Sequence, residues 1–160
     1  MIEKFIAFLK DNNWKIEEND TKSDVYSNSV LSGYENLPTV FLEFLQKYKS
    51  VTSEDETCFF LCVDDYSGES DLAFKWNEFE LMSLEAAEGD KDWTNDIKSW
   101  WKPKLPFFMS VGGEYLYYAI DTEDGGTILS GYEPEFEEAD KVADSFEDFM
   151  CKVINGDIVL

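Results

Sequence analysis

The sequence predicts an α+β fold in a single domain: an antiparallel or mixed sheet, with a β-meander in its C-terminal half, flanked by N- and C-terminal helices. Three observations predict this class. Apolar residues recur at helical spacing near both ends of the chain. Strand-like segments separated by glycine-rich turns occupy residues 105–132. The 160 residues contain no repeat and no linker, and this length suits one domain.

Two helices are predicted in the first third of the chain. Residues 2–12 are predicted to form an amphipathic helix, because their apolar residues recur at helical spacing: Ile2, Phe5, Ile6 and Leu9. Residues 12–36 are polar and weakly patterned, so they predict a loop with room for one short helix. Pro38 opens the next helix, because proline is preorganised for the first helical position. The apolar stripe of this helix consists of Val40, Phe41, Phe44, Leu45 and Tyr48.

The middle of the chain predicts short strands followed by two helices. Residues 57–63 are apolar on both alternating faces and bounded by carboxylates, which indicates a strand covered on both faces. Residues 72–74 are a second candidate strand, and residues 79–88 predict a helix. A further helix, ending before Pro103, has a stripe made of Trp93, Ile97, Trp100 and Trp101.

A meander and a final helix are predicted in the last third. Strands over residues 105–111, 115–121 and 127–132 are separated by glycine pairs, which favour hairpin turns. Ser145 is then a candidate N-cap, with Asp148 three residues on as in a capping box. Gly156 is the expected C-terminal cap. The stripe of this helix is formed by Phe146, Phe149, Met150, Val153 and Ile154.

The charge of the chain restricts its partners. Asp and Glu number 35 against 13 cations, all of them lysines, so the net charge is −22. Such a surface repels nucleic acids and anionic membranes, because both are bound by neutralising their phosphates. It favours a basic protein partner, since complementary fields speed encounter and suppress wrong partners. The alternative is that the charge serves only to keep the protein soluble.

The absence of histidine and arginine argues against catalysis. Without histidine there is no Ser-His-Asp or Cys-His pair, and without arginine there is no bidentate phosphate clamp. Two carboxylates could hydrolyse a glycoside, but no spacing picks out such a pair. The sequence therefore predicts a binding protein, with no catalytic residue and no cofactor.

The thiols and glycine loops predict neither a disulfide nor a metal site. Cys58 and Cys62 would lie about 13 Å apart along one strand, too far to bridge, and both are expected as core thiols. The loops around Gly68 and Gly126 fail the ligand positions of a calcium-binding EF-hand. With no signal peptide and no apolar run of about 18 residues, a reducing cytoplasmic location is expected.

The candidate partner-binding residues come from two acidic clusters and from the aromatic set. Residues 54–71 hold seven carboxylates and no lysine, and residues 133–148 hold eight carboxylates and one lysine. Most of the aromatic residues between 93 and 118 are expected in the core, but some reach the surface, where aromatic side chains make good interface anchors. The predicted binding residues are Asp64, Asp65, Glu69, Asp71, Trp76, Trp100, Tyr115, Glu135, Glu137 and Glu138.

The order of several motifs resembles the SUKH superfamily, the Smi/Knr-type domain, over residues 35–155. The motifs are Leu37-Pro38-x-x-Phe41-x-x-Phe44-Leu45, Trp76-x-x-Phe79-Glu80, Leu105-Pro106-Phe107-Phe108, Tyr115-x-Tyr117-Tyr118-Ala119-Ile120-Asp121 and Ala143-x-Ser145-Phe146-x-x-Phe149. The chain departs from the Asn-Gly-Gly that many members carry after the first of these helices; it has Tyr48-Lys49-Ser50 there.

The resemblance implies an α+β fold and a non-enzymatic role in binding. Bacterial members are immunity proteins of polymorphic toxin systems, which bind and neutralise a cognate toxin, often a nuclease. A fungal branch regulates the cell wall as an interaction scaffold. The sequence and the resemblance together predict an immunity protein that binds a basic toxin; the alternative is an intracellular scaffold or regulatory module without a toxin partner.

Overall fold

The computed structural model describes all 160 residues and contains one sheet of seven strands. The strands lie side by side in sequence order, and each pairs antiparallel with the next. They are β1 (Lys15–Glu18), β2 (Tyr48–Thr52), β3 (Cys58–Phe60), β4 (Lys104–Ser110), β5 (Leu116–Asp121), β6 (Thr127–Tyr132) and β7 (Asp140–Ala143). The predicted α+β class is confirmed, and the sheet is wholly antiparallel.

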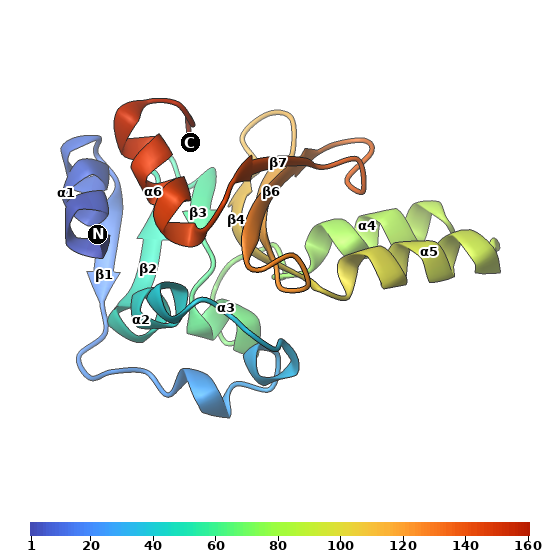
Figure 1. The fold of residues 1–160 in the computed structure, drawn as a ribbon, viewed down its shortest axis with the longest axis horizontal. Helices are drawn as coiled ribbons and strands as arrows, with labels where there is room; N and C mark the ends of the chain where they lie inside the picture. The colour runs from blue at the N-terminus through green and yellow to red at the C-terminus, as the bar shows by residue number, and fades with distance from the viewer.

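Helices lie on both faces of this sheet (Figure 1). On one face are α1 (Ile2–Asp11), α2 (Thr39–Lys47) and α6 (Phe146–Asn155). The hairpin of α4 (Glu78–Ala86) and α5 (Lys91–Trp101) packs on the other face and projects away from the sheet. The short helices are α3 (Val63–Ser67), η1 (Val25–Ser27) and η2 (Leu31–Gly33). None of the helices is long and apolar enough to cross a membrane.

Two neighbouring tyrosines of β5 show how both faces are filled. Successive side chains of a strand point to opposite faces. The ring of Tyr118 lies 4.9 Å from that of Phe149 in α6, whereas the ring of Tyr117 lies 4.9 Å from that of Trp101 in α5. Both tyrosines are buried. The central strands are therefore covered on both sides, as predicted for the strand containing Phe59 and Phe60, which are also both buried.

A bulge in β4 concentrates aromatic rings on the face covered by α1, α2 and α6. The register between β4 and β5 shifts between Pro106 and Phe108. The rings of Phe107 and Phe108 consequently both contact Tyr118, at 6.4 and 5.3 Å between centroids. A bulge places adjacent residues on one face in this way. Each buried ring contributes about 1.5–3 kcal/mol to folding by leaving water.

The terminal helices agree with their sequence patterns. The Ser145 hydroxyl accepts a hydrogen bond from the Asp148 amide at 3.1 Å, so the predicted N-cap is confirmed. Gly156 ends α6 in the left-handed conformation at φ 80°, as expected of a C-terminal cap. The Asp148 carboxylate accepts from the Asp144 amide at 2.9 Å, one residue before the position of a standard capping box.

Two predicted segments in the first half were wrong in extent: the helix that begins at Pro38, at both of its ends, and the loop over residues 12–36. Pro38 precedes α2 instead of occupying its first position. Tyr48 belongs to β2 and not to the helix, although it lies four residues after Phe44. Residues 12–36 hold β1 and two 3-10 helices, not a loop with one short helix.

The predicted strand over residues 57–63 is also shorter than expected. It ends at Phe60, and Val63 already begins α3. Residues 72–74 are irregular and not a strand. Cys62 is buried as predicted, but Cys58 is only half-buried, with its thiol 3.4 Å from the Ser110 hydroxyl.

Candidate functional site

Four of the predicted acidic residues meet in one cavity of about 450 Å³, here called the acidic hollow. Strands β1, β2 and β3 form its floor, and α3 with the segment that follows it forms its wall. Its hydrophobic lining residues are Phe59, Phe60 and Leu72, of which the two phenylalanines are buried. Its charged side chains are Glu17, Lys49, Glu56, Asp64, Asp65, Glu69 and Asp71.

Three carboxylates of the acidic hollow have no cation beside them. Glu17 pairs with Lys49 at 3.3 Å. Glu56 pairs with Lys15 at 2.8 Å, on the exposed surface. Asp64, Glu69 and Asp71 make no ion pair, and Glu69 and Asp71 are exposed. These three side chains are therefore available to a cationic group of another molecule.

Asp65 has a structural role within the same cavity. It is buried, and its carboxylate accepts a hydrogen bond of 2.6 Å from the Cys62 amide at the start of α3. Burial raises the pKa of the Asp65 carboxyl, opposed by the hydrogen bonds from the Cys62 amide and from Ser70. Asp65 thus fixes the helix that carries Asp64.

Four carboxylates of the second predicted acidic cluster line a separate cavity of about 340 Å³ at the far end of the sheet. It lies between the end of β6 and the start of β7. We call it the Tyr132 patch, and its residues are Tyr132, Glu135, Glu137, Glu138, Ala139 and Asp140. Tyr132 is 50% exposed, so an aromatic ring stands beside four carboxylates. Of these, Glu137 is held in place, because it accepts a hydrogen bond of 2.6 Å from the Trp101 indole.

The three aromatic residues predicted to bind a partner are all half-buried. Trp76 lies 6.1 Å from Tyr66, and Tyr115 packs between Phe74 and Phe79. Trp100 lies beneath the Lys104 ammonium, which is 4.5 Å from its ring centroid. The exposed aromatic side chains are instead Tyr26, Trp93 and Tyr132, at 71, 49 and 50%.

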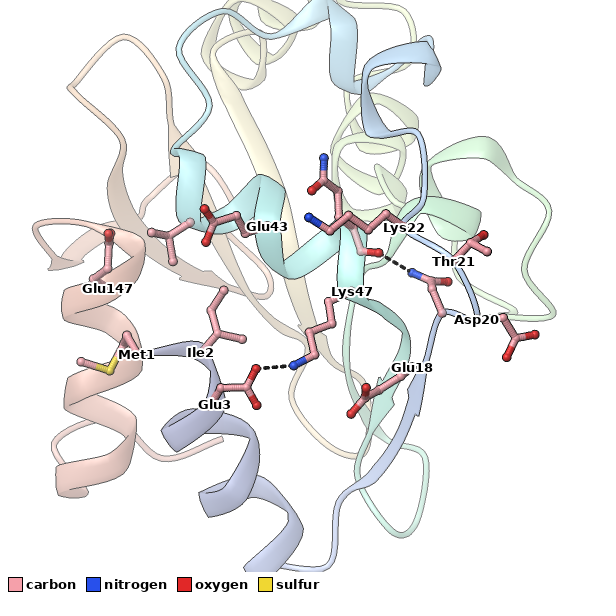
Figure 2. A pocket seen from close by; sticks show the side chains of 13 residues that line it. Met1, Ile2, Glu3, Glu18, Asp20, Thr21, Lys22, Glu43, Lys47 and Glu147 are labelled. Carbon is pink, nitrogen blue, oxygen red and sulfur yellow. Dashed lines mark hydrogen bonds and ion pairs between the residues drawn. The ribbon is translucent and has the colours of Figure 1, made fainter.

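A third and larger cavity, of about 830 Å³, lies between α1, the segment after β1 and α2 (Figure 2). We call it the N-terminal cavity. Its acidic side chains are Glu3, Glu18, Asp20, Glu43 and Glu147. These residues are scattered over the sequence, and only Glu147 belongs to one of the two predicted acidic clusters. Lys47 reaches across the cavity to Glu3 and forms an ion pair with it (Figure 2).

The family of the chain follows from its sequence match. The family model described as SMI1 / KNR4 family (SUKH-1) matches residues 3–152, a wider span than the resemblance over residues 35–155. The chain belongs to the SMI1/KNR4 family. No curated protein and no solved structure matches this SUKH-1 chain. No group of three or more Cys, Asp or Glu side chains in the SUKH-1 chain is arranged to hold a metal ion.

Proposed function

We propose that this SUKH-1 protein is an immunity protein that neutralises a basic toxin by direct binding. The observation that carries the proposal is the acidic hollow, where Asp64, Glu69 and Asp71 line one cavity and make no ion pair. Family membership supports a binding role, and the net charge of −22 supports a basic partner.

The chemistry of the hollow suits a toxin that acts on nucleic acid. Such an enzyme binds phosphates with lysine and arginine side chains. Carboxylates placed at the same spacing as phosphates compete for those cations. The protein would then cover the substrate-binding face of the toxin, and inhibition would need no chemistry of its own.

The Tyr132 patch provides a second point of contact. Tyrosine buries a large ring at low entropic cost and is enriched among residues that dominate interface energies. Charged side chains around the ring then contribute mainly to the rate and specificity of association. The hollow and the patch lie at opposite ends of the sheet, so one broad partner or two segments of it would be required to reach both.

Co-expression tests the proposal. The chain is produced together with the toxin-like protein encoded beside its gene, and growth of the host is followed. Growth should be rescued by the wild-type chain and poorly by the triple variant Asp64→Asn, Glu69→Gln, Asp71→Asn. Continued killing in the presence of soluble wild-type chain contradicts the proposal. A gene neighbourhood without any toxin favours the scaffold alternative.

A further inference from the structure

The open sheet ends in two edge strands, β1 and β7, and these two edges differ (Figure 1). At β7, Val142 has no partner in the register with β6, and the Lys152 ammonium donates a hydrogen bond of 2.8 Å to its carbonyl. A side chain of α6 therefore already occupies an acceptor of this edge. Covering an edge in this way discourages the addition of another strand.

Nothing comparable covers β1. Its backbone groups make no hydrogen bond outside the ladder with β2. In an antiparallel ladder only alternate residues direct their backbone groups to the neighbouring strand, so the remaining groups of β1 point outward without a partner. Three of its four residues are exposed, Lys15, Glu17 and Glu18. A row of unpaired N–H and C=O groups of this kind is a template for a further strand.

The side chains of β1 alternate between two different surroundings. Glu17 lines the acidic hollow, whereas Glu18, after the bulge, lines the N-terminal cavity on the other face. Ile16 packs against the hydrophobic core. A strand added outside β1 continues both faces of the sheet at a spacing of about 4.8 Å. Its alternate side chains would therefore lie beside Glu17 at the hollow and beside Ile16 on the opposite face.

The charges decide which strand fits this edge. On the face of Glu17, the added side chains meet the cavity lined by Asp64, Glu69 and Asp71, which make no ion pair. Lysine or arginine is the complementary residue there. On the face of Ile16, an apolar side chain extends the existing apolar surface. A second copy of this chain is a poor occupant, because two molecules with a net charge of −22 repel each other.

We propose that the outer edge of β1 pairs with an extended segment of the basic partner in which lysine or arginine alternates with apolar residues. Backbone hydrogen bonds join the segment to β1, and its cationic side chains extend over the acidic hollow. The apolar side chains lie beside Ile16. The identity of the partner rests on the proposed function, and the edge strand adds the way in which that partner binds.

The test uses the peptide N-acetyl-Lys-Val-Lys-Val-Lys-amide and the full chain, observed by NMR at low salt. Hydrogen exchange of alternate amides within residues 15–18 should slow about tenfold or more when the peptide is bound. Two methylated forms of the peptide are then compared. One carries a methyl group on the backbone nitrogen of each valine, and the other carries them on the second and third lysines.

The methylated forms distinguish a paired strand from a merely attracted cation. Successive N–H groups of a strand point to opposite sides, so only one of the two forms loses the hydrogen bonds to β1. That form should bind about tenfold more weakly or worse, and the other should keep the affinity of the parent peptide. Glu17→Gln should weaken the parent peptide several-fold. Glu88→Gln, the same change of charge on the hairpin, is the matched control and should leave the affinity unchanged.

Several results would overturn the assignment. These are equal affinities of the two methylated forms, an unaffected Glu17→Gln, or equal binding of a peptide with glutamate in place of lysine. A dimer of the chain that protects the β1 amides would identify a second copy as the occupant. If a basic toxin is bound and neutralised but the β1 amides exchange as before, the edge assignment fails and the proposed function stands. If the peptides behave as described but no toxin partner exists, the proposed function fails and β1 remains a site for a basic segment.

Discussion

The Tyr117 hydroxyl donates a hydrogen bond of 2.6 Å to the Phe136 carbonyl, across the backbone of Gly131. Gly131 is the cross-strand partner of Tyr117 in β6. This bond ties the loop between β6 and β7 to the centre of the sheet. Glu135, Glu137 and Glu138 of the Tyr132 patch are carried by that loop, so a core tyrosine helps to fix their positions.

Removing this hydroxyl should destabilise the protein. Tyr117→Phe leaves the buried Phe136 carbonyl unpaired, and the free energy of unfolding should fall by about 1–3 kcal/mol. Urea unfolding followed by tryptophan fluorescence measures the change. Tyr26→Phe is the control, because this side chain is 71% exposed and its hydroxyl makes no hydrogen bond within the protein, so its loss should not lower stability. Equal losses in the two variants would contradict this account.

A side chain at position 131 should have a comparable effect. A Cβ built on Gly131 would lie 2.5 Å from the Tyr117 hydroxyl and 2.6 Å from its ring. Gly131→Ala therefore forces the ring or the strand to move, at a cost of about 1–3 kcal/mol. Gly113→Ala has no atom within 4 Å of the new Cβ and should change stability by less than about 0.5 kcal/mol. Similar melting temperatures for the two variants would rule out the proposed crowding.

Asp65 and Asp55 should respond to pH with opposite signs. Burial raises the pKa of Asp65 above its ordinary 3.8, so ionised Asp65 opposes folding at neutral pH, and this penalty disappears as the pH falls through the raised value. Hydrogen bonds from Ser53 and Thr57 lower the pKa of Asp55, so its ionised form stabilises the fold above 3.8, and that contribution is lost on acidification through the lowered value.

The corresponding asparagine variants separate these effects. The free energy of unfolding of Asp65→Asn, relative to that of the wild type, should be highest at about pH 7, and this advantage should be lost at about pH 4. The free energy of unfolding of Asp55→Asn, relative to that of the wild type, should be lowest at about pH 7 and should approach the wild-type value in acid. Urea unfolding at about pH 7 and 4 gives the difference for Asp65→Asn, and for Asp55→Asn the comparison is extended to about pH 2, because its lowered pKa lies below 3.8. A difference for Asp65→Asn that is constant with pH would show that its carboxyl is not perturbed.

Exposed aromatic rings should differ in their effect on partner binding. Tyr132 and Trp93 are about equally exposed, at 50 and 49%, but Tyr132 stands among carboxylates and Trp93 lies on α5 of the projecting hairpin. Tyr132→Ala should weaken the affinity for the partner by about tenfold or more, which is the effect of losing an interface anchor. Trp93→Ala should have little effect. Calorimetric titration of the partner with both variants makes the comparison, and the reverse order would place the interface on the hairpin.

The sequence predicted the elements with long periodic patterns and failed where a pattern was short. The four-residue strand β1 has one apolar residue, Ile16, and β7 is equally short. Such strands form because a neighbouring strand offers unpaired backbone groups, a tertiary cause that no local pattern shows. Tyr48 illustrates the other difficulty: it continues the apolar stripe of α2, so spacing alone could not show that the helix had ended.

The sequence indicated which types of residue line the candidate site, but it did not indicate the role of each residue. Part of each acidic cluster lines a surface cavity, because these residues are close in sequence. Asp65 was predicted as a binding residue but caps α3, a role hidden by the apolar run that made residues 57–63 read as one strand. Tyr132 was not singled out, since its exposure depends on where β6 ends. The N-terminal cavity joins residues 3, 18, 43 and 147, and only the fold brings these together.

The account depends most on attraction between the acidic hollow and a basic partner, and the association rate tests it most directly. The rate is measured by stopped flow at about 20 and 200 mM salt for three proteins. The first two are the wild type and the triple variant Asp64→Asn, Glu69→Gln, Asp71→Asn. The third is a control of the same net charge with its substitutions on the hairpin, Glu85→Gln, Glu88→Gln, Asp92→Asn. As the salt rises from the lower to the higher concentration, we expect the association rates of the wild type and of the control to fall tenfold or more. They should then be about equal to the association rate of the triple variant. Rates that do not change with salt, or a control as slow as the triple variant, would contradict the central claim.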